Sequence, residues 1–282
     1  MPTFDTPNPV SVSLDLVVCD VRVTASDRAD TTVEVRPSNA AAETDVRTAE
    51  QTHVEFTDGR LTIRMPKQRG RLGIFGRPGS VDLTIALPTG SRLDGGGAVT
   101  TIHTEGRLGS CRLRTATGSI VLGDAGDVDL QTSAGGIEVG RIDGHAQVTT
   151  AAGRVRLGDV AGNLAVRNSN GDTRIGAVGG DLRAKAANGD ITVDRTQGTV
   201  TAATANGDVS IGMVAAGSVS LKTGFGEVSV GVPAGTAARL DLHTQHGQVV
   251  NDLATCEPPG HPDGTVEVTA RTSFGDIVVH RR

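Results

Sequence analysis

The stretch Asn168-Ser-Asn-Gly-Asp-Thr-Arg-Ile175 returns twice with small changes, as Ala186-Ala-Asn-Gly-Asp-Ile-Thr-Val193 and as Thr204-Ala-Asn-Gly-Asp-Val-Ser-Ile211. A turn glycine at the same place recurs at intervals of 17, 18, 18, 18, 18 and 19 residues: Gly118, Gly135, Gly153, Gly171, Gly189, Gly207 and Gly226. A fixed period of this length is typical of a solenoid, in which each coil of the chain stacks on the one before it.

The residues on both sides of the turn glycine predict strands. Apolar and β-branched residues stand two and four places after it, as in Val155 and Leu157, and this period of two is typical of a strand with one buried face. Before the glycine, an apolar residue stands five places back, and the third place back is usually threonine. Strands that recur once per coil in one direction pair in parallel with the next coil. The sequence therefore predicts an all-β, single-domain parallel β-helix with about 18 residues per coil, whose handedness stays open.

The repeat is regular over residues 113–282 and irregular over residues 1–112, which we expect to form N-terminal coils and a cap continuous with the solenoid. Leu14 to Val23 and Val54 to Ile63 fit the same columns, and Val268 to Val279 fit as a final coil. Insertions are predicted at residues 39–50, with a short helix, at 67–79, at 94–97, and between Gly247 and Gly275. Residues 39–50 and 280–282 are the predicted caps of the two ends, because open solenoid ends polymerise.

Composition excludes several classes of function. The chain of 282 residues has 27 Lys and Arg against 32 Asp and Glu, a net charge of −5, which argues against nucleic-acid binding. It has no Trp or Tyr and only 5 Phe, so aromatic platforms for sugars or bases are not expected. Cys19, Cys111 and Cys256 show no paired spacing, which indicates reduced thiols. We find no segment typical of a signal peptide or membrane span and expect a cytoplasmic location.

An acidic residue follows the turn glycine in four successive repeats: Asp172, Asp190, Asp208 and Glu227. Like charges stacked about 4.8 Å apart repel one another. We interpret the stripe as a solvated row at structural turns, in which Asn-Gly supplies the tight turn and stacked Asn side chains hydrogen-bond. The alternative is a site for a divalent cation, as in glycine- and aspartate-rich solenoids, although those repeats are only about nine residues long.

Two basic features suggest partners. One outward column contains Arg114, Gln131, Thr149, Arg167, Lys185, Ala203, Lys222, His243 and Arg271, and a partly basic side favours self-association or docking to a protein. The other is a basic loop around the apolar pair Ile74-Phe75, a candidate for peripheral contact with an anionic membrane: Arg64, Lys67, Arg69, Arg71, Phe75 and Arg77. Solvated strand faces and a surface loop are the structural alternatives.

No catalytic constellation is recognisable. The carboxylates form a line instead of facing pairs, and the seven histidines show no metal-ligand spacing. Phosphate-binding and nucleophile motifs are absent. We therefore expect no catalytic residues, no cofactor and no enzymatic activity.

Several stretches resemble a known family. Phe4-Asp-Thr-Pro7, Gly79-Ser-Val-Asp-Leu-Thr-Ile-Ala-Leu-Pro-Thr-Gly90 and Ser273-Phe-Gly-Asp-Ile-Val278 are similar to the bacterial putative-adhesin family of β-strand-repeat proteins, with actinobacterial members looking most similar. The resemblance covers essentially the whole chain. It implies a β-helical domain of unknown function and assigns no catalytic or binding residues.

Three functional hypotheses remain open. The first is a non-enzymatic scaffold or protein-interaction module. The second is an adhesin-like or envelope-associated protein that binds a glycan or an anionic surface, and the third is a self-assembling, cytoskeletal-type solenoid. A polysaccharide-active enzyme would require two carboxylates that face each other across a groove about 5–10 Å wide.

Overall fold

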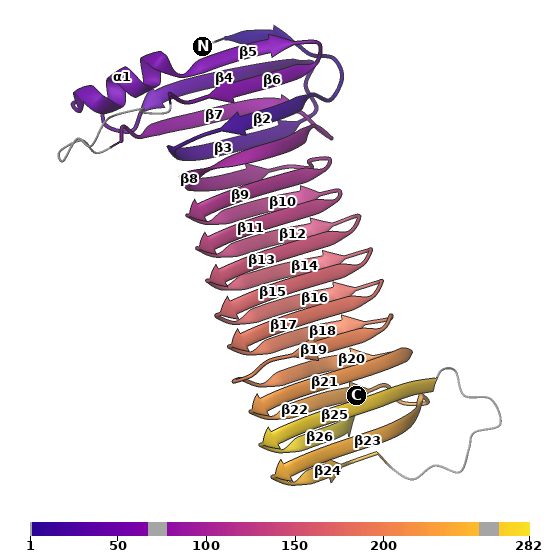
Figure 1. Ribbon diagram of the computed structural model, residues 1–282. Helices are drawn as coiled ribbons and strands as arrows, with labels where there is room; N and C mark the ends of the chain where they lie inside the picture. Colours follow the sequence, from indigo (N-terminus) through magenta and orange to yellow (C-terminus); the bar gives the residue numbers. More distant parts are fainter. Residues whose placement is uncertain (1, 67–77, 254–264) are drawn as a thin grey trace. The chain divides into compact units, whose positions relative to one another are not determined.

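The computed structural model describes residues 2–66, 78–253 and 265–282. The described residues form strands β1 to β26 and one helix, α1 (Figure 1). All strands belong to one hydrogen-bonded sheet whose strands run mainly in parallel around an axis. The predicted all-β parallel β-helix is therefore confirmed. The chain divides into two compact units, Met1–Val139 and Gly140–Arg282.

Unit 2 is the regular part, and each coil in it contributes two strands. One row of parallel strands runs in the order β13 (Ala146–Ala152), β15 (Leu164–Asn170), β17 (Leu182–Asn188), β19 (Val200–Ala203), β21 (Gly217–Phe225), β25 (Thr265–Phe274), β23 (Ala237–His246). The other row runs β14 (Val155–Val160), β16 (Thr173–Val178), β18 (Ile191–Thr196), β20 (Val209–Val214), β22 (Val228–Val232), β26 (Ile277–Arg281), β24 (Val249–Asn251).

The inward columns are the predicted ones. Val166 pairs with Ala184 and Ala184 with Ala202, and all three are buried. The second strand of a coil is interrupted: in β14, the pairing with β16 stops after Leu157 and resumes at Val160. These stacked inward rows form the core of the unit, and each fully buried aliphatic side chain contributes about 1.5–3 kcal/mol.

The turn between the two strands of a coil requires glycine. Gly189 has a φ of +124°, which side-chain-bearing residues rarely adopt. A Cβ atom at this position would also lie only 2.4 Å from the carbonyl oxygen of Gly171 in the neighbouring coil. The same positive φ recurs at Gly118, Gly135, Gly153, Gly171, Gly207 and Gly226, so all seven predicted turn glycines are turn residues.

The threonines before the turn fasten one coil to the next. Thr223 Oγ1 donates a hydrogen bond to the Gly207 carbonyl at 2.8 Å, and Thr272 Oγ1 donates one to the Gly226 carbonyl at 3.1 Å. Both threonines are buried, so each hydroxyl needs a protein partner. The row therefore satisfies turn carbonyls that the backbone ladder leaves open.

The C-terminal coil does not lie at the outer edge of unit 2. Strands β25 and β26 insert between the coil of β21 and β22 and the coil of β23 and β24, so the sequence-based expectation of a final coil at Val268 to Val279 is wrong in its spatial order. His280 and Arg281 pair with β22, and the predicted cap at residues 280–282 is wrong for the same reason. Arg281 Nη1 donates hydrogen bonds to the carbonyls of Pro233 and Thr236, each at 2.8 Å. These bonds anchor the connection between β22 and β23 to β26.

In unit 1 too, the order of the coils in space differs from their order in the sequence, and here a later coil lies outside the first one. Its strands are β1 (Thr3–Asp5), β2 (Ser11–Asp15), β3 (Val18–Ser26), β4 (Asp30–Pro37), β5 (His53–Thr57), β6 (Arg60–Arg64), β7 (Val81–Pro88), β8 (Arg92–Glu105), β9 (Cys111–Thr117), β10 (Ile120–Ala125) and β11 (Val128–Ala134). Strand β12 (Ile137–Ile142) spans the boundary between the units. The first coil, β2 and β3, lies between β8 on one side and β6 and β7 on the other.

Two expectations about unit 1 are corrected. Residues 53–64 form the antiparallel hairpin β5–β6 instead of a coil, because Asp58 and Gly59 both have positive φ, +49° and +73°, as a two-residue hairpin turn requires. Residues 94–97 are not an insertion, since they lie within β8 and pair with β2 and β9.

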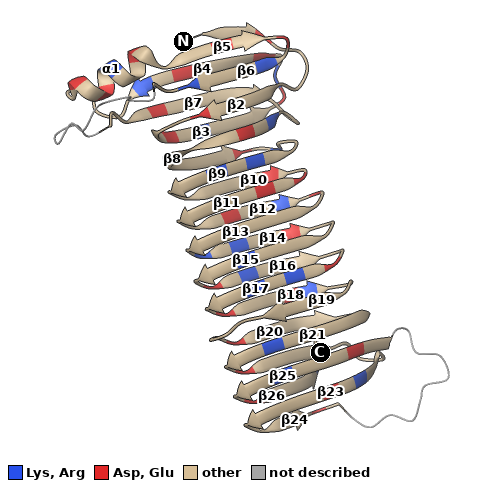
Figure 2. Ribbon diagram, in the orientation of Figure 1, with Lys and Arg blue, Asp and Glu red and all other residues tan. Residues whose placement is uncertain are grey.

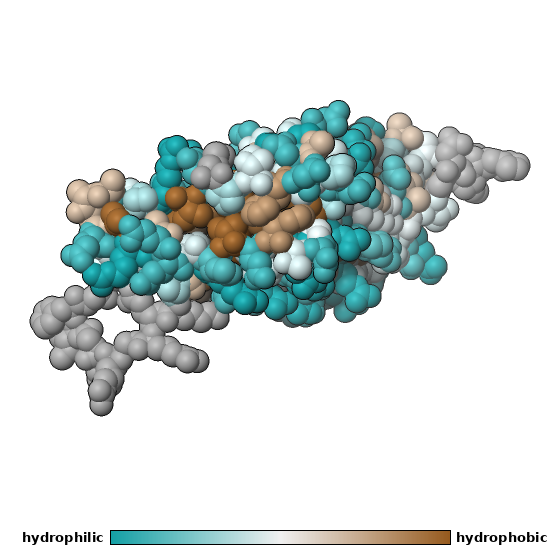
Figure 3. Space-filling model, turned by 90° about the horizontal axis from the view of Figure 1, so that it is seen from above, coloured by the Kyte–Doolittle hydropathy of each residue, from teal (hydrophilic) through white to brown (hydrophobic). Residues whose placement is uncertain are grey.

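The predicted short helix is confirmed as α1 (Glu43–Gln51), which packs on β4 and β7. The outer strands of this end are β1 and β5, each held by an antiparallel partner. Their rings Phe4 and Phe56 stack at 5.0 Å between centroids. Figure 3 looks onto this end and shows a brown hydrophobic band between hydrophilic margins.

Candidate interaction surfaces

A basic surface covers the outward side of β15, β17, β19 and β21. We call it the basic face and define it by four exposed side chains, Arg167, Arg183, Lys185 and Lys222. Strand alternation positions them, because the residues between them point into the core and are buried. Arg167 lies beside Lys185 in the next coil, and Ala203 separates Lys185 from Lys222. Their strands can be followed in Figure 2.

The basic face has no acidic neighbour within its own strands. None of the residues of β15, β17, β19 and β21 is Asp or Glu. Apart from Phe225, the remaining outward residues are small or polar, such as Ala165, Ser169 and Thr201. The next strands, β25 and β23, continue the column with Arg271 and His243, and Arg271 forms an ion pair with Asp241 at 3.5 Å. The predicted column is confirmed within unit 2, with Arg271 before His243 in space.

The same column is less basic in unit 1. Arg114 pairs in register with Gln131, as predicted. Asp129 lies 3.5 Å from Arg112 and 3.7 Å from Arg114, so it neutralises part of this surface. The concentration of unbalanced positive charge is therefore a property of unit 2.

The acidic stripe has a structural role in the turns. Asp190 Oδ1 accepts a hydrogen bond from the Asp208 amide at 2.8 Å, and Asp208 Oδ1 accepts one from the Glu227 amide at 2.7 Å. Asp172 accepts one from the Asp190 amide at 3.4 Å. Each of the three aspartate carboxylates thus accepts a hydrogen bond from a backbone amide of the next coil, which offsets the repulsion between stacked charges. The described residues contain no group of three or more His, Cys, Asp or Glu that could hold a metal ion, and cation binding by the stripe stays a prediction.

A row of side chains that contains no Asp, Glu, Lys or Arg follows the corner of the coils, one residue before each turn glycine. Asn188 Nδ2 donates to Asn170 Oδ1 at 2.8 Å, and Asn206 Nδ2 donates to Asn188 Oδ1 at 2.9 Å, which confirms the predicted Asn ladder. The row continues with three aromatic rings. Phe225 and Phe274 stack at 4.9 Å and 2° between planes, and His246 stacks on Phe274 at 4.6 Å and 14°.

These rings are more exposed than composition led us to expect. Phe225 is 57% exposed and Phe274 is 45% exposed. Phe274 lies between the other two rings, so both of its faces are covered by stacking. The signal was present in the sequence, since Phe225, His246 and Phe274 each precede a turn glycine, but the rings are far apart along the chain.

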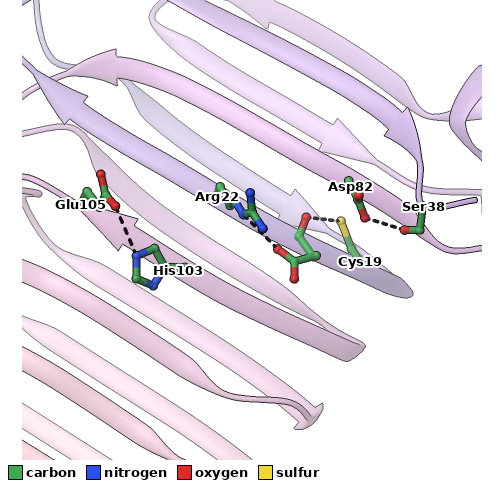
Figure 4. A network of polar contacts seen from close by, with 7 residues as sticks. Cys19, Arg22, Ser38, Asp82, His103 and Glu105 are labelled. Carbon is green, nitrogen blue, oxygen red and sulfur yellow. Dashed lines mark hydrogen bonds and ion pairs between the residues drawn. The ribbon is translucent and has the colours of Figure 1, made fainter.

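A polar cluster in unit 1 lies on the outward side of β3, β7 and β8 (Figure 4). Arg22 and Asp20 approach to 3.8 Å, and His103 and Glu105 to 3.5 Å. The Cys19 thiol points to the Asp20 carbonyl, while the His103 imidazole points to Glu105 (Figure 4). Cysteine and histidine are therefore not arranged as a nucleophile and its base.

The two described cysteines are free, buried thiols. Burial raises the pKa of Cys19 to about 12, with a smaller contribution from the negative charges of Asp20 and Asp82. Burial also raises the pKa of Cys111 to about 12. A thiol acts as a nucleophile only as the thiolate, so neither side chain is reactive near neutral pH.

Most of the predicted anionic-surface loop cannot be placed. Lys67, Arg69, Arg71, Phe75 and Arg77 lie outside the described residues. Arg64 ends β6, where it pairs with His53 of β5 and Asp15 of β2, and it is exposed. No described helix is long and apolar enough to span a membrane.

The stacked inward columns and the parallel pairing of strands between coils define the class of this chain as a parallel β-helical repeat protein. The family model described as Toastrack DUF4097 matches residues 11–280, and the chain belongs to this family. The predicted membership in a bacterial β-strand-repeat family is therefore confirmed. No curated protein matches the chain.

The chain is also similar to solved structures of bacterial proteins. A putative adhesin from Bacteroides fragilis is 10% identical, with 99% of this chain and 95% of that chain covered and a TM-score of 0.34. A putative adhesin from Parabacteroides distasonis is 13% identical, with 100% and 95% covered and a TM-score of 0.33. A putative lipid binding protein from the same species is 11% identical, with 98% and 95% covered and a TM-score of 0.37. At these values, their names say nothing about what this chain binds, and the likeness to actinobacterial members stays a prediction.

Proposed function

We propose that this protein is a non-enzymatic interaction module that binds an acidic protein partner on the basic face of unit 2. One observation carries the proposal: Arg167, Arg183, Lys185 and Lys222 are exposed on β15, β17 and β21, and neither these strands nor β19 between them contain an acidic residue. Complementary charge steers a partner to such a surface and determines how it docks. The high pKa of Cys19 and of Cys111 and the placement of His103 support a role without catalysis.

A regular β-helix suits this role. The backbone hydrogen bonds between coils hold the basic side chains at fixed intervals, so the unit does not have to order itself when it binds. Preorganised surfaces lose less conformational entropy on association. A long partner can contact several coils at once, and each contact is weak because it is exposed to solvent.

The test is binding of a fluorescent poly-glutamate peptide, measured by anisotropy at several salt concentrations. The variant Arg167→Glu with Lys185→Glu and Lys222→Glu should weaken binding by about tenfold or more, since three weak attractions become repulsions. The matched control is Arg156→Glu with Arg174→Glu and Arg195→Glu, which reverses the same number of exposed charges on the other row of strands and should change binding less than about twofold. Equal losses in the two variants would overturn the proposal.

An anionic surface is the second candidate, because the small side chains between the cations, such as Ala165 and Ala203, leave the heads of long basic side chains free to reach it. Co-sedimentation with phosphatidylglycerol vesicles separates the two candidates. Binding to these vesicles but not to the peptide, lost in the same triple variant, would assign the face to an envelope-associated role instead.

A cytoplasmic location is part of the proposal. Cys19 and Cys111 are unpaired in the structure, which is common where thiols stay reduced. Fractionation of cells that express the full chain tests it. Recovery of the protein in the envelope fraction after a high-salt wash would contradict a cytoplasmic location.

A further inference from the structure

The last coil of unit 2, formed by β23 and β24, has an open side. Within the described residues, β23 pairs only with β25, and β24 pairs only with β26. In a parallel ladder, the backbone groups of a strand point alternately to the two sides. The outer side of β23 therefore offers a row of amide and carbonyl groups for another strand (Figure 1).

The inward side chains of this coil are incompletely covered. Leu240 and Leu242 are half-buried, whereas their neighbours in β25, Val268 and Ala270, are fully buried. Val249 is 46% exposed, whereas Ile277, which pairs with it in β26, is 0% exposed. The apolar core of unit 2 thus reaches the surface at this coil, and pairing with another strand would cover it.

Strand β23 has few of the features that normally protect an edge. It runs for ten residues and contains no Pro and no Lys. Natural edge strands are usually short, bulged or interrupted by such residues. At the outer end of unit 1, by contrast, β1 has three residues and β5 has five, and Phe4 and Phe56 stack on each other.

The charges of β23 indicate which strand fits. Arg239 and Asp241 are exposed and stand on the same outward face. If a second β23 pairs antiparallel about Leu240, Arg239 of each copy faces Asp241 of the other, so two opposite-charge pairs form. The same register places Leu240 opposite Leu240 of the second copy and Ala238 opposite Leu242, all on the inward face. Directly opposed side chains in such a pair lie about 4.5–5.5 Å apart and interact favourably.

We propose that the outer edge of β23 binds a second copy of this chain, through antiparallel β23–β23 pairing, to form a closed two-fold dimer. The interface uses the same edge in both copies, so association stops at two. It lies on a different surface from the basic face and goes beyond the function proposed above. Pairing would also extend the core by placing the two inward rows edge to edge.

Sedimentation velocity between about 1 and 300 μM tests the proposal on the full chain. The wild type should sediment as a dimer at the upper end. Asp241→Arg, which leaves two arginines on the edge, and Arg239→Asp, which leaves two aspartates, should each raise the dimer dissociation constant by about tenfold or more. Because both residues are exposed, we expect the variants to stay folded. The circular dichroism spectrum and the melting temperature check this.

Two combinations make the test specific. An equimolar mixture of the Asp241→Arg and Arg239→Asp proteins should form a heterodimer, because every opposed pair is then Arg with Asp. The double variant Arg239→Asp with Asp241→Arg should dimerise like the wild type. The matched control is Glu55→Arg on β5, the edge strand of unit 1, which should leave the association unchanged.

Three results would overturn the proposal. The first is a wild type that stays monomeric throughout the range. The second is a dimer that the Arg239 and Asp241 variants do not weaken. The third is growth beyond the dimer into filaments, which would show an open-ended contact between unlike surfaces.

Discussion

In the threonine row of unit 2, two neighbouring positions lack a hydroxyl, Asn168 and Ala186, and the side chain of the first serves both. Ala186 stands where other coils have threonine and has no side-chain donor for the Gly171 carbonyl. Asn168 Nδ2 donates to that carbonyl at 2.7 Å and to its own target, the Gly153 carbonyl, at 3.0 Å. A single buried amide therefore does the work of two hydroxyls.

The substitution Asn168→Thr should destabilise unit 2 by about 1–3 kcal/mol, because the Gly171 carbonyl loses its side-chain donor. Adding Ala186→Thr should recover most of this loss by restoring the regular row. A double-mutant cycle measured by chemical denaturation reports the coupling. Strictly additive effects of the two substitutions would show that Asn168 does not compensate for Ala186.

The buried thiols predict a loss of stability in alkali. The pKa of Cys19 and of Cys111 is raised from 9.0 to about 12 in the folded chain, so the folded state keeps protons that the unfolded state releases. The contribution of each protonated thiol to the free energy of unfolding is complete below pH 9. It is lost as the pH rises from 9 to 12, by up to about 1.4 kcal/mol per pH unit for each thiol. The chain has no tyrosine to titrate in the same range.

The measurement is the free energy of unfolding between pH 8 and pH 11 for the wild type and for Cys19→Ala and Cys111→Ala. Each variant starts from a lower stability because of its cavity, so the slope against pH is compared instead of the level. A slope that neither substitution reduces would mean that the thiols ionise in the folded state. Labelling of Cys19 and Cys111 with iodoacetamide at pH 7, followed for each by peptide mass spectrometry, should likewise be slow until the chain unfolds.

At the scale of the strand, each inward residue packs against the residue at the same position in the neighbouring coil. Val155 in β14 is fully buried and pairs with Thr173 in β16. Val155→Asp places a carboxylate among aliphatic side chains without a partner, which costs several kcal/mol and should unfold much of the unit. Arg156→Asp, at the next and exposed residue, is the matched control and should change the melting temperature little. Similar melting curves for the two variants would contradict the assignment of the inward column.

The sequence was sufficient to predict the strands of the regular coils because each coil repeats the same inward residues. It was less informative where a different pairing has the same pattern. Val54 to Ile63 alternate like a coil, and only Asp58-Gly59 distinguishes the hairpin. The order of the last coils in space could not be predicted either, because β23 and β25 both present apolar inward residues that could pack beside β21. Leu242 of β23 and Ala270 of β25, for example, occupy the same inward column as Leu221 of β21.

Of the candidate surfaces, the sequence predicted the column of basic residues but not the hydrogen bonds at the turns or the open edge. Arg167, Lys185 and Lys222 could be assigned to one outward column because strand alternation and the period determine it. The hydrogen bonds of Asp190 and Asp208 to the next coil could not be foreseen, because they depend on the side-chain rotamer at the turn. The open edge of β23 follows only from the insertion of β25, which the pattern does not specify.

At the scale of the whole molecule, the stability of a segment should follow its place in the stack instead of its distance from the chain terminus. Strands β25 and β26 have a neighbour on each side, whereas β23 and β24 have one. In unit 1, β3 lies between β7 and β8, whereas β5 pairs only with β6 among the described residues. Edge strands open locally at a lower free energy than strands paired on both sides.

Hydrogen exchange measured by mass spectrometry should therefore show slower exchange in residues 266–279 than in residues 238–250, although the former lie nearer the C-terminus. Residues 19–26 should likewise exchange more slowly than residues 53–57. The Asp241→Arg protein is the suitable sample, because dimer formation would protect β23 in the wild type, and β21 serves as the internal reference. Protection that decreases steadily from residue 217 to residue 282 would show that β25 does not insert between β21 and β23 in solution, and the open edge at β23 would then have to be reassigned.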